Sequence, residues 1–421
     1  MTDWSTLPLG DVITLKRGYD LPTRDRTTGP FPLVSSSGPS DTHHEPKVRG
    51  PGVVTGRYGT IGQVFYVQED FWPLNTTLYV RDFKGNDPRF VYYFLQTLDW
   101  GKFNDKSGVP GVNRNDAHRE RVSVPTPADQ ASIAEVLSSL DDKIDLNHRT
   151  AGTLEAMARA VFRDWFVAFG PVRRRMAGAS DPHAVLGGLI PDGVDPERAA
   201  TLAAPFPDRL DDDGLPEGWK RERLKEHVKV TRGLSYKGSG LTDDDDGVPL
   251  HNLNSIFEGG GFKEKGMKRY SGPHKDKHRV QPGDVVVANT EQGFDHLLIG
   301  FAARVPDDEA AAAIFSHHLY RVDPRPGSAL TRNWLAYALN ASPLGAVVRG
   351  FSNGTTVNML PTDGLALPTF AVPSTPLIYA FDELTEPMQQ RARAGERENR
   401  TLAATRDLLL PRLMSGELRV G

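Results

Sequence analysis

The sequence offers one dense group of side chains suited to binding chemistry, between residues 263 and 279. Cations are interleaved there with Tyr270 and His274, and they are Lys263, Lys265, Lys268, Arg269, Lys275, Lys277 and Arg279. Cations contact phosphates, and polar or flat side chains contact bases, so this composition favours a surface that meets nucleic acid. A charged loop that only faces water has the same composition, and both interpretations stay open at this point.

A second group of candidate binding residues lies nearer the N-terminus. Arg57 and Tyr58 stand in a glycine-rich stretch, 56–62, and Lys106 and Arg114 flank a second glycine-containing turn. Arginine and lysine are suited to guanine edges, and asparagine and glutamine to adenine edges. Each of these residues, taken alone, is more typical of an ordinary surface.

Residue types and spacing give no catalytic motif. The stretch 56–62 lacks the Lys-Ser/Thr ending of a phosphate-binding P-loop. The adjacent pairs His43–His44 and His317–His318 would point to opposite faces of a strand, which suits shared metal coordination badly. Motifs for dinucleotide binding and methyl transfer do not occur in the sequence, which also contains no cysteine. We therefore expect a non-catalytic chain that binds no metal or cofactor itself.

The composition predicts a soluble protein with more than one domain. Its 421 residues exceed one ordinary core, and no apolar run approaches the roughly 18 residues of a membrane helix. The first residues do not resemble a secretory signal, and the lack of cysteine rules out disulfides, so we expect a cytoplasmic location. A net charge of −4 argues against coating nucleic acid through bulk charge but allows local basic surfaces.

The order of elements along the chain occurs twice. A strand-rich segment leads through a proline into a long helix, first over residues 7–169 and again from about 215 onward. Matching landmarks recur in order: Lys16-Arg17-Gly18 with Thr231-Arg232-Gly233, and Pro110-Gly111-Val112-Asn113 with Thr355-Thr356-Val357-Asn358. This duplication predicts an α+β protein with two similar but diverged globular units.

The helix that follows the first unit carries a coiled-coil pattern. Apolar or small residues recur at spacings of four and three over about four heptads: Ile133, Leu137, Leu140, Ile144, Asn147, Ala151, Leu154, Ala158, Val161 and Trp165. Thr126 is suited to cap this helix and Pro127 to begin it. A polar Asn147 within the seam is suited to set the register, and a frayed polar site explains it equally well.

The equivalent helix near the C-terminus has a weaker pattern. It is expected to begin near Thr375, its middle from 389 to 398 is polar, and Pro387 favours a kink. If the two helices pack antiparallel, their seams bury each other.

Five short motifs resemble the specificity subunit of type I restriction-modification systems, a family of phage defence, over essentially the whole chain. In order, they are the stretches Gly56–Gly62, Leu140–Asn147, Val161–Val167, Leu215–Trp219 and Leu408–Leu418. Each is short, but their order together with the duplication is specific. The resemblance implies an α+β fold of two pseudo-symmetric target-recognition domains separated by two long antiparallel coiled-coil helices.

The resemblance also implies a division of the chain and a set of partners. The expected segments are a first target-recognition domain (1–125), a first spacer helix (126–169), a linker (170–214), a second target-recognition domain (215–370) and a second spacer helix (371–421). Each domain is expected to read half of an asymmetric, bipartite site in double-stranded DNA. Two modification subunits that methylate adenine with S-adenosylmethionine are expected to dock, and restriction subunits that use ATP and Mg²⁺ are possible further partners.

Candidate contacts are assigned by position in this resemblance. Expected DNA contacts are Ser36, Ser37, Arg57, Tyr58, Thr60, Lys106 and Arg114 in the first domain, and Lys263, Lys265, Lys268, Arg269, Tyr270, Asn289 and Asn353 in the second. Expected helix-packing residues are Leu137, Leu140, Ile144, Leu154, Leu402 and Leu409. The alternative function is a coiled-coil scaffold that links protein partners without reading DNA.

Overall fold

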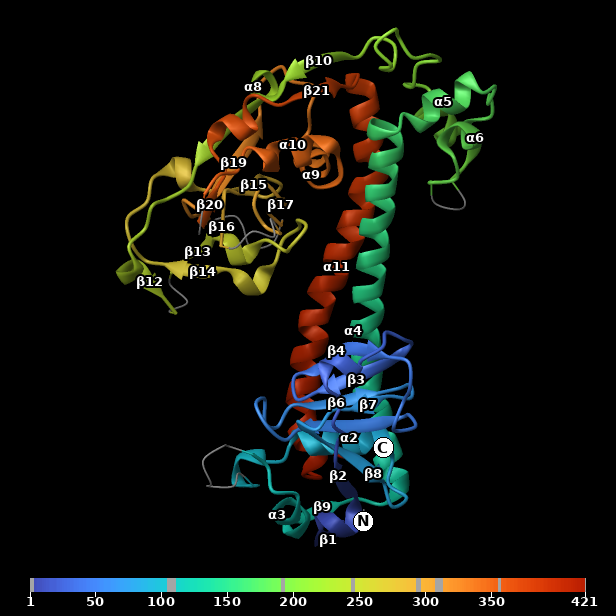
Figure 1. Cartoon of the computed structure of the whole chain (residues 1–421), viewed down its shortest axis with the longest axis vertical. Helices are drawn as coiled ribbons and strands as arrows, with labels where there is room; N and C mark the ends of the chain where they lie inside the picture. The colour runs from blue at the N-terminus through green and yellow to red at the C-terminus, as the bar shows by residue number, and fades with distance from the viewer. Residues whose placement is uncertain are drawn as a thin grey trace. The chain divides into compact units, whose positions relative to one another are not determined.

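Two compact units make up the chain in the computed structural model (Figure 1). The structure describes residues 4–103, 111–190, 194–243, 247–292, 297–306, 313–354 and 357–420. The first unit contains Met1–His148 and Gly395–Gly421, and the second contains Arg149–Ala394. Each unit is α+β and includes part of both long helices, α4 (Pro127–Phe162) and α11 (Thr375–Met414). The five predicted segments stay a prediction, because the compact units cut across these helices.

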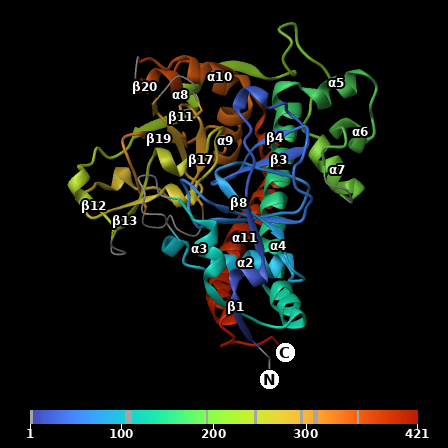
Figure 2. The ribbon, with the colours of Figure 1, turned by 60° about the horizontal axis from the view of Figure 1, so that its bottom comes forward.

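The first unit combines two small sheets with a short strand pair. β1 (Ser5–Pro8) pairs with β9 (Arg121–Val124). One sheet has the order β2 (Thr14–Arg17), β8 (Thr77–Asp82), β5 (Gly52–Gly56) and β6 (Val64–Val67). The other has the order β4 (Gly38–His43), β3 (Phe31–Ser35) and β7 (Trp72–Pro73). The helices are α1 (Leu9–Val12), α2 (Pro88–Gln96) and α3 (Arg114–Arg119), and α2 lies beside α4 (Figures 1 and 2).

The second unit repeats this plan. β10 (Lys220–Arg223) pairs with β21 (Thr369–Val372). One sheet has the order β11 (Val228–Arg232), β19 (Leu319–Pro324), β15 (Val285–Ala288) and β17 (Ala302–Arg304). The other has the order β12 (Leu241–Thr242), β14 (Lys268–Tyr270), β13 (Val248–His251) and β18 (Ile314–Phe315). A separate ribbon joins β16 (Thr290–Gln292) to β20 (Val357–Met359), and the helices are α8 (Leu224–His227), α9 (Arg332–Ala341) and α10 (Pro343–Gly350).

Main-chain hydrogen bonds make the equivalence of the two units specific. The amide of Leu9 donates to Glu120 as the amide of Leu224 donates to Pro368. Gly18 is likewise matched by Gly233. A Cβ at Gly18 would overlap the carbonyl oxygen of Leu74, and a Cβ at Gly233 would overlap that of Ser316. The predicted fold class, α+β with two pseudo-symmetric units and two long antiparallel helices, is confirmed.

The apolar run Leu298-Ile299-Gly300-Phe301, punctuated by glycine, predicts a strand from the sequence, but the structure has none there. This segment forms a turn, and β17 begins only at Ala302. The buried carboxylate of Glu291 accepts backbone hydrogen bonds from Leu297 (2.8 Å), Leu298 (3.2 Å) and Ile299 (3.0 Å). These bonds replace the ladder partners that a strand would need.

The first long helix follows the predicted pattern closely. Thr126 caps it, because the Asp129 amide donates to the Thr126 Oγ1 atom (3.3 Å) and this hydroxyl donates to the Asp129 carboxylate (2.7 Å). Its last turn widens into a π-helix, Arg163–Val167. Helix α11 begins at Thr375 as expected and continues through Pro387 as one helix. Because proline has no amide hydrogen, the backbone carbonyl of the exposed Glu383, four residues earlier, receives no helical hydrogen bond.

The segment expected as a linker folds into three short helices, α5 (Gly170–Met176), α6 (Pro182–Leu186) and α7 (Pro196–Ala203). The sequence predicts a short helix within this linker at about 196–203, which α7 confirms, but it gives no sign of α5 and α6. The three helices bury apolar residues against the end of α4, and Phe206 packs edge-to-face on Trp165 at 5.0 Å between ring centroids. Helices of seven and five residues, such as α5 and α6, are too short to show a clear period in the sequence.

Across the described ranges, no helix is both long and apolar enough to cross a membrane.

Candidate nucleic-acid interface

In the first unit, two predicted loops meet at the end of strand β5. A Cβ at Gly59 would lie 3.4 Å from the Ser36 Oγ atom, so the β3–β4 turn lies against the turn that follows β5. The Arg57 guanidinium stacks on the Tyr58 ring, 4.4 Å from its centroid. The Tyr58 backbone pairs with Gly111, where a side chain would overlap the tyrosine ring. Ser36, Arg57 and Tyr58 therefore form one surface.

The other predicted residues of the first unit are placed less centrally. Thr60 is half-buried in the turn after β5, and Ser37 is exposed with its hydroxyl 3.0 Å from that of Ser35. Arg114 is exposed at the start of α3. Just before α3, the Val112 amide donates to the Arg57 carbonyl (3.0 Å), which ties this segment to the Arg57 loop through the backbone. Lys106 lies outside the described residues.

In the second unit, Asn289 and Thr290 occupy the place of Arg57 and Tyr58. The Arg57 carbonyl accepts a hydrogen bond from the Val112 amide, and the Asn289 carbonyl accepts one from the Leu360 amide (2.8 Å). The two pairs of residues also follow equivalent strands, β5 and β15. The same scaffold position therefore carries a stacked cation in one unit and a neutral pair in the other.

Asn289 and Tyr270 are buried rather than presented to solvent. Asn289 is 2% exposed and its amide donates to the His317 carbonyl (3.0 Å), while its Oδ1 atom has no partner among the described residues. Tyr270 is 5% exposed and packs with Leu234 and Leu250. In this conformation Asn289 positions the loop and Tyr270 supports the sheet, so neither side chain reaches a ligand directly.

Thr290 contacts His318, and Lys268 lies close enough for its charge to act on this histidine. The Thr290 hydroxyl lies 2.8 Å from the His318 Nδ1 atom. The pKa of His318 is lowered mainly by burial, with smaller contributions from the charges of His317 and Lys268. An imidazole held neutral in this way acts as a hydrogen-bond donor and acceptor, while exposed Lys268 supplies positive charge beside it.

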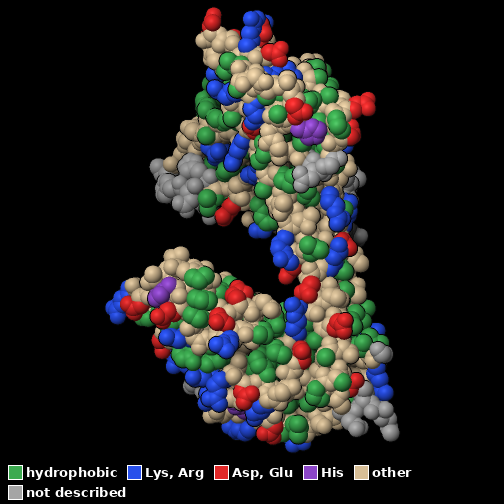
Figure 3. Space-filling model, turned by 90° about the vertical axis from the view of Figure 1, so that its right-hand side faces the viewer, with side chains coloured by type: hydrophobic (Ala, Val, Ile, Leu, Met, Phe, Trp, Pro, Cys, Tyr) green, Lys and Arg blue, Asp and Glu red, His purple; other side chains and the backbone are tan. Residues whose placement is uncertain are grey.

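Most of the remaining predicted residues of the second unit are exposed. Lys263 and Lys265 are exposed, and the Lys263 ammonium lies 5.8 Å from the centroid of the Phe257 ring. Arg269 is half-buried and donates to the Gly247 carbonyl (2.8 Å). Asn353 is exposed, and its backbone pairs with Met359 of β20. On the face shown in Figure 3, cations alternate with Asp and Glu on both units, in keeping with the net charge of −4.

Sequence reasoning missed Thr290, His318, Val357 and Met359 in the second unit. By the sequence landmarks, Val112 corresponds to Val357. By the main-chain hydrogen bonds to Arg57 and Asn289, Val112 corresponds instead to Leu360, three residues later. A signal was available in the pattern of the second unit. The pair Asn289-Thr290 directly follows the buried strand 285–288, as Arg57-Tyr58 follow the strand 52–56.

A pair of asparagines joins the two long helices within the first unit. Asn147 is 4% exposed and donates to Asn399 Oδ1 (2.9 Å), to Glu398 (2.9 Å) and to the Gly395 carbonyl (3.4 Å). Asn399 donates in return to the Ile144 carbonyl (3.4 Å). Reciprocal buried bonds of this kind fix which turns of α4 and α11 face each other.

The predicted packing residues have differing burial. Leu137 is fully buried, and the half-buried ones are Leu140, Ile144, Leu154, Leu402 and Leu409. Leu137 and Leu409 belong to the core of the first unit, and Leu154 packs against that of the second.

A tyrosine from each globular part binds a carboxylate on a long helix. In the first unit the Tyr93 hydroxyl donates to Asp141 (2.6 Å), which also accepts from Arg406 of α11 (2.7 Å). In the second unit the Tyr337 hydroxyl donates to Glu155 (2.9 Å). Burial is the largest cause that raises the pKa of both tyrosines, so each stays a neutral donor. These bonds attach each globular part to its helices.

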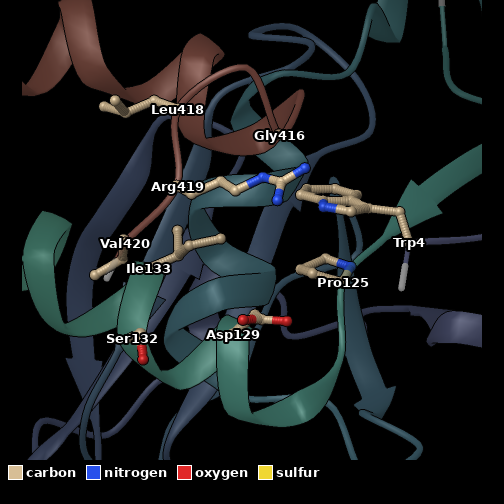
Figure 4. Close-up of a pocket in the computed structure, with 9 residues that line it drawn as sticks. All are labelled: Trp4, Pro125, Asp129, Ser132, Ile133, Gly416, Leu418, Arg419 and Val420. Carbon is tan, nitrogen blue, oxygen red and sulfur yellow. The ribbon is translucent and has the colours of Figure 1, made fainter. Parts of the chain in front are cut away.

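The first unit also contains a small pocket. Its lining includes Trp4, Ile133 and Arg419, and Figure 4 shows the Arg419 side chain directed towards the Trp4 ring. Trp219 stands five residues before Leu224 as Trp4 does before Leu9, and it is buried against Phe166 and Phe169.

Comparisons with known proteins agree with this architecture. Residues 1–156 match the family described as type I restriction modification DNA specificity domain. The chain is 24% identical to the HindI specificity subunit of Haemophilus influenzae, covering 99% of this chain and 100% of the relative. It is 22% identical to the MjaIX specificity subunit of Methanocaldococcus jannaschii, covering 83% of this chain and 74% of the relative.

A solved structure supports the fold. The crystal structure of the type I restriction-modification S subunit from M. genitalium superposes with a TM-score of 0.59 at 13% identity, covering 98% of this chain and 96% of that one. Together with the sequence matches, this likeness shows that the chain is similar over nearly its whole length to specificity subunits of type I restriction-modification systems.

Proposed function

We propose that this chain reads an asymmetric, bipartite DNA site, with each unit contacting one half. The observation that carries the proposal is the shared scaffold position at the end of β5 and β15. There, Arg57 stacked on Tyr58 in the first unit is replaced by Asn289 and Thr290 in the second. Two equivalent frames that present different chemical groups are suited to two different base sequences.

The long helices are proposed to set the number of unread base pairs between the halves. Their register is supported by the reciprocal bonds of Asn147 and Asn399. The tyrosine contacts to Asp141 and Glu155 support a constant attachment of each globular part to its own helical segment. A base-pair spacing can be selected only by a frame whose parts do not slide.

The chemistry is proposed to come from partner subunits. Two modification subunits would dock on repeated surfaces and methylate adenine with S-adenosylmethionine, and restriction subunits that use ATP and Mg²⁺ would join in some complexes. This chain would then supply recognition without catalysis. The duplicated scaffold supports the pair of docking surfaces, since identical partners need equivalent surfaces.

The test is sequence selection from a random DNA library by the purified complex of this chain with its modification subunit. The proposal expects one enriched motif with two unlike halves and a constant gap. Loss of all enrichment in an assembled complex contradicts it. Counting modification subunits per chain by mass in the same preparation tests the docking part, for which two are expected.

A charge reversal separates this function from the alternative of a scaffold that links proteins without reading DNA. Lys268 is exposed beside Thr290 and His318, so Lys268→Glu should weaken DNA binding and reduce its salt dependence. Lys220→Glu, an exposed position on β10, is the matched control and should change affinity little. Equal effects of the two substitutions would favour the scaffold.

A further inference from the structure

Two apolar side chains are exposed side by side in the second unit. Val357 is 46% exposed and Met359 is 44% exposed, whereas Asn358 between them is 5% exposed. Alternate residues of a strand point to the same side, so Val357 and Met359 of β20 share one solvent-facing side. Adjacent exposed apolar side chains of this kind form a surface that a partner molecule can cover.

The strand that carries them is held firmly. β20 pairs with β16 in an antiparallel register that places Thr290 opposite Met359. The next residue of β16, Glu291, is 6% exposed, and its carboxylate accepts three backbone amides from residues 297–299. Met359 is therefore presented by an ordered ribbon, and little conformational freedom is lost when it meets a ligand.

The position of the ribbon points to DNA as the partner. Thr290 and Met359 occupy the scaffold place of Tyr58 and Gly111 in the first unit, where Arg57 lies at the proposed DNA surface. Thr290 also contacts His318, whose pKa is lowered in part by the charge of Lys268. An apolar pair with a cation nearby matches a base edge beside a phosphate.

Among the four bases, thymine alone presents an apolar group, its C5-methyl, in the major groove. We infer that Val357 and Met359 contact thymine methyl groups in the half-site read by the second unit. This inference rests on the proposed function and adds the base type and the residues that select it. The stacked Arg57 of the first unit offers hydrogen-bond donors instead, which suit guanine.

Deoxyuridine in place of thymine tests the inference, because it removes the methyl group and keeps base pairing. The assembled complex is measured against its selected duplex, with each thymine of both half-sites replaced in turn. We expect one or two positions in a single half-site to lose about four- to tenfold in affinity, the effect of leaving one methyl group uncovered. A selected site whose uracil duplexes all bind as tightly as the parent overturns the inference, as does a half-site without thymine.

Substitution of the ribbon links the effect to its residues. Met359→Ala should weaken binding to the thymine duplex and abolish the difference between thymine and uracil at the sensitive position. Val347→Ala, 48% exposed on α10, is the control and should preserve that difference. A thymine preference that survives in both Met359→Ala and Val357→Ala contradicts the assignment. Failure of the proposed function is distinguishable, because the library would then yield no motif at all.

Discussion

The two units share a main chain and differ in the side chains placed upon it. Gly18 and Gly233 both pass closely by a carbonyl oxygen, and equivalent amides of Leu9 and Leu224 donate to equivalent partners. At the end of the matching strands, however, the first unit has a stacked arginine where the second has a neutral asparagine. The difference teaches that the duplication preserved what the backbone requires and left the loops free to change.

The interiors differ as well as the loops. Val34 in the first unit corresponds to His251 in the second. The Val34 carbonyl accepts from the Leu74 amide, directly after the parallel strand β7, and the His251 carbonyl accepts from the Ser316 amide, directly after the parallel strand β18. His251 is 1% exposed, and neither ring nitrogen has a partner in the described part of the chain. Its burial lowers its pKa to about 4. One unit therefore carries an acid-sensitive core position that the other lacks.

Glycine substitutions test the shared scaffold and should have the largest effects. Gly18→Val and Gly233→Val each place a side chain against a backbone carbonyl, so each should destabilise its own unit by about 3 kcal/mol or more. Amide hydrogen exchange, read separately for the two units, is the measurement. Gly238→Ala, which has open space around its Cβ, is the control. Strongly unequal effects of the two valines would break the equivalence.

Acid sensitivity should distinguish the units next. The folded pKa of His251, about 4, lies below the usual value of 6.5, so protonation favours the unfolded chain and stability falls as the pH drops below 6.5. Between pH 7 and pH 5 the second unit should lose about 2 kcal/mol through this residue. His251→Val should remove that loss in urea titrations at the two pH values.

The exposed His148 supplies the control for this experiment. His148→Gln should leave the pH dependence of the second unit as it is in the parent chain. An unchanged pH dependence in His251→Val would show that this position does not separate the units.

The tyrosine attachments should respond with smaller, similar losses. Tyr93→Phe and Tyr337→Phe each remove one hydrogen bond to a carboxylate, so each should cost about 1.5 kcal/mol in its own unit. Tyr92→Phe serves as the control, because Tyr92 precedes Tyr93 in the sequence and its own side chain is half-buried. Urea unfolding measures the loss of stability in each variant. A loss smaller than that of the control would show that these tyrosines do not hold the globular parts to the helices.

The paired asparagines should have the smallest effect on stability. Replacing Asn147 and Asn399 together by leucine removes both polar partners at once, so the free energy of unfolding should change by less than about 1 kcal/mol. The register of α4 against α11 loses its specific bonds, and library selection should then yield more than one gap length. A single unchanged gap would show that these residues do not set the spacing.

Periodic features of the sequence predicted the elements well, and their local surroundings explain the failures. The seam from Ile133 to Trp165 was visible because burial repeats with the helix turn. Tyr270 and Asn289 are expected as contacts by their position in the resemblance, but position along the chain does not report burial, and both side chains are buried. The absence of a strand at 298–301 depends on Glu291, whose bonds arise only after folding.

The central claim is that one duplicated frame carries two independent readers, and DNA library selection with the Arg57→Ala complex tests it most directly. Arg57 belongs to the first unit alone, so the selected motif should relax at one base pair of one half-site, at a cost of about 1–3 kcal/mol. The other half and the gap should remain those of the parent complex. Altered bases in both halves, or a changed gap, would contradict the account.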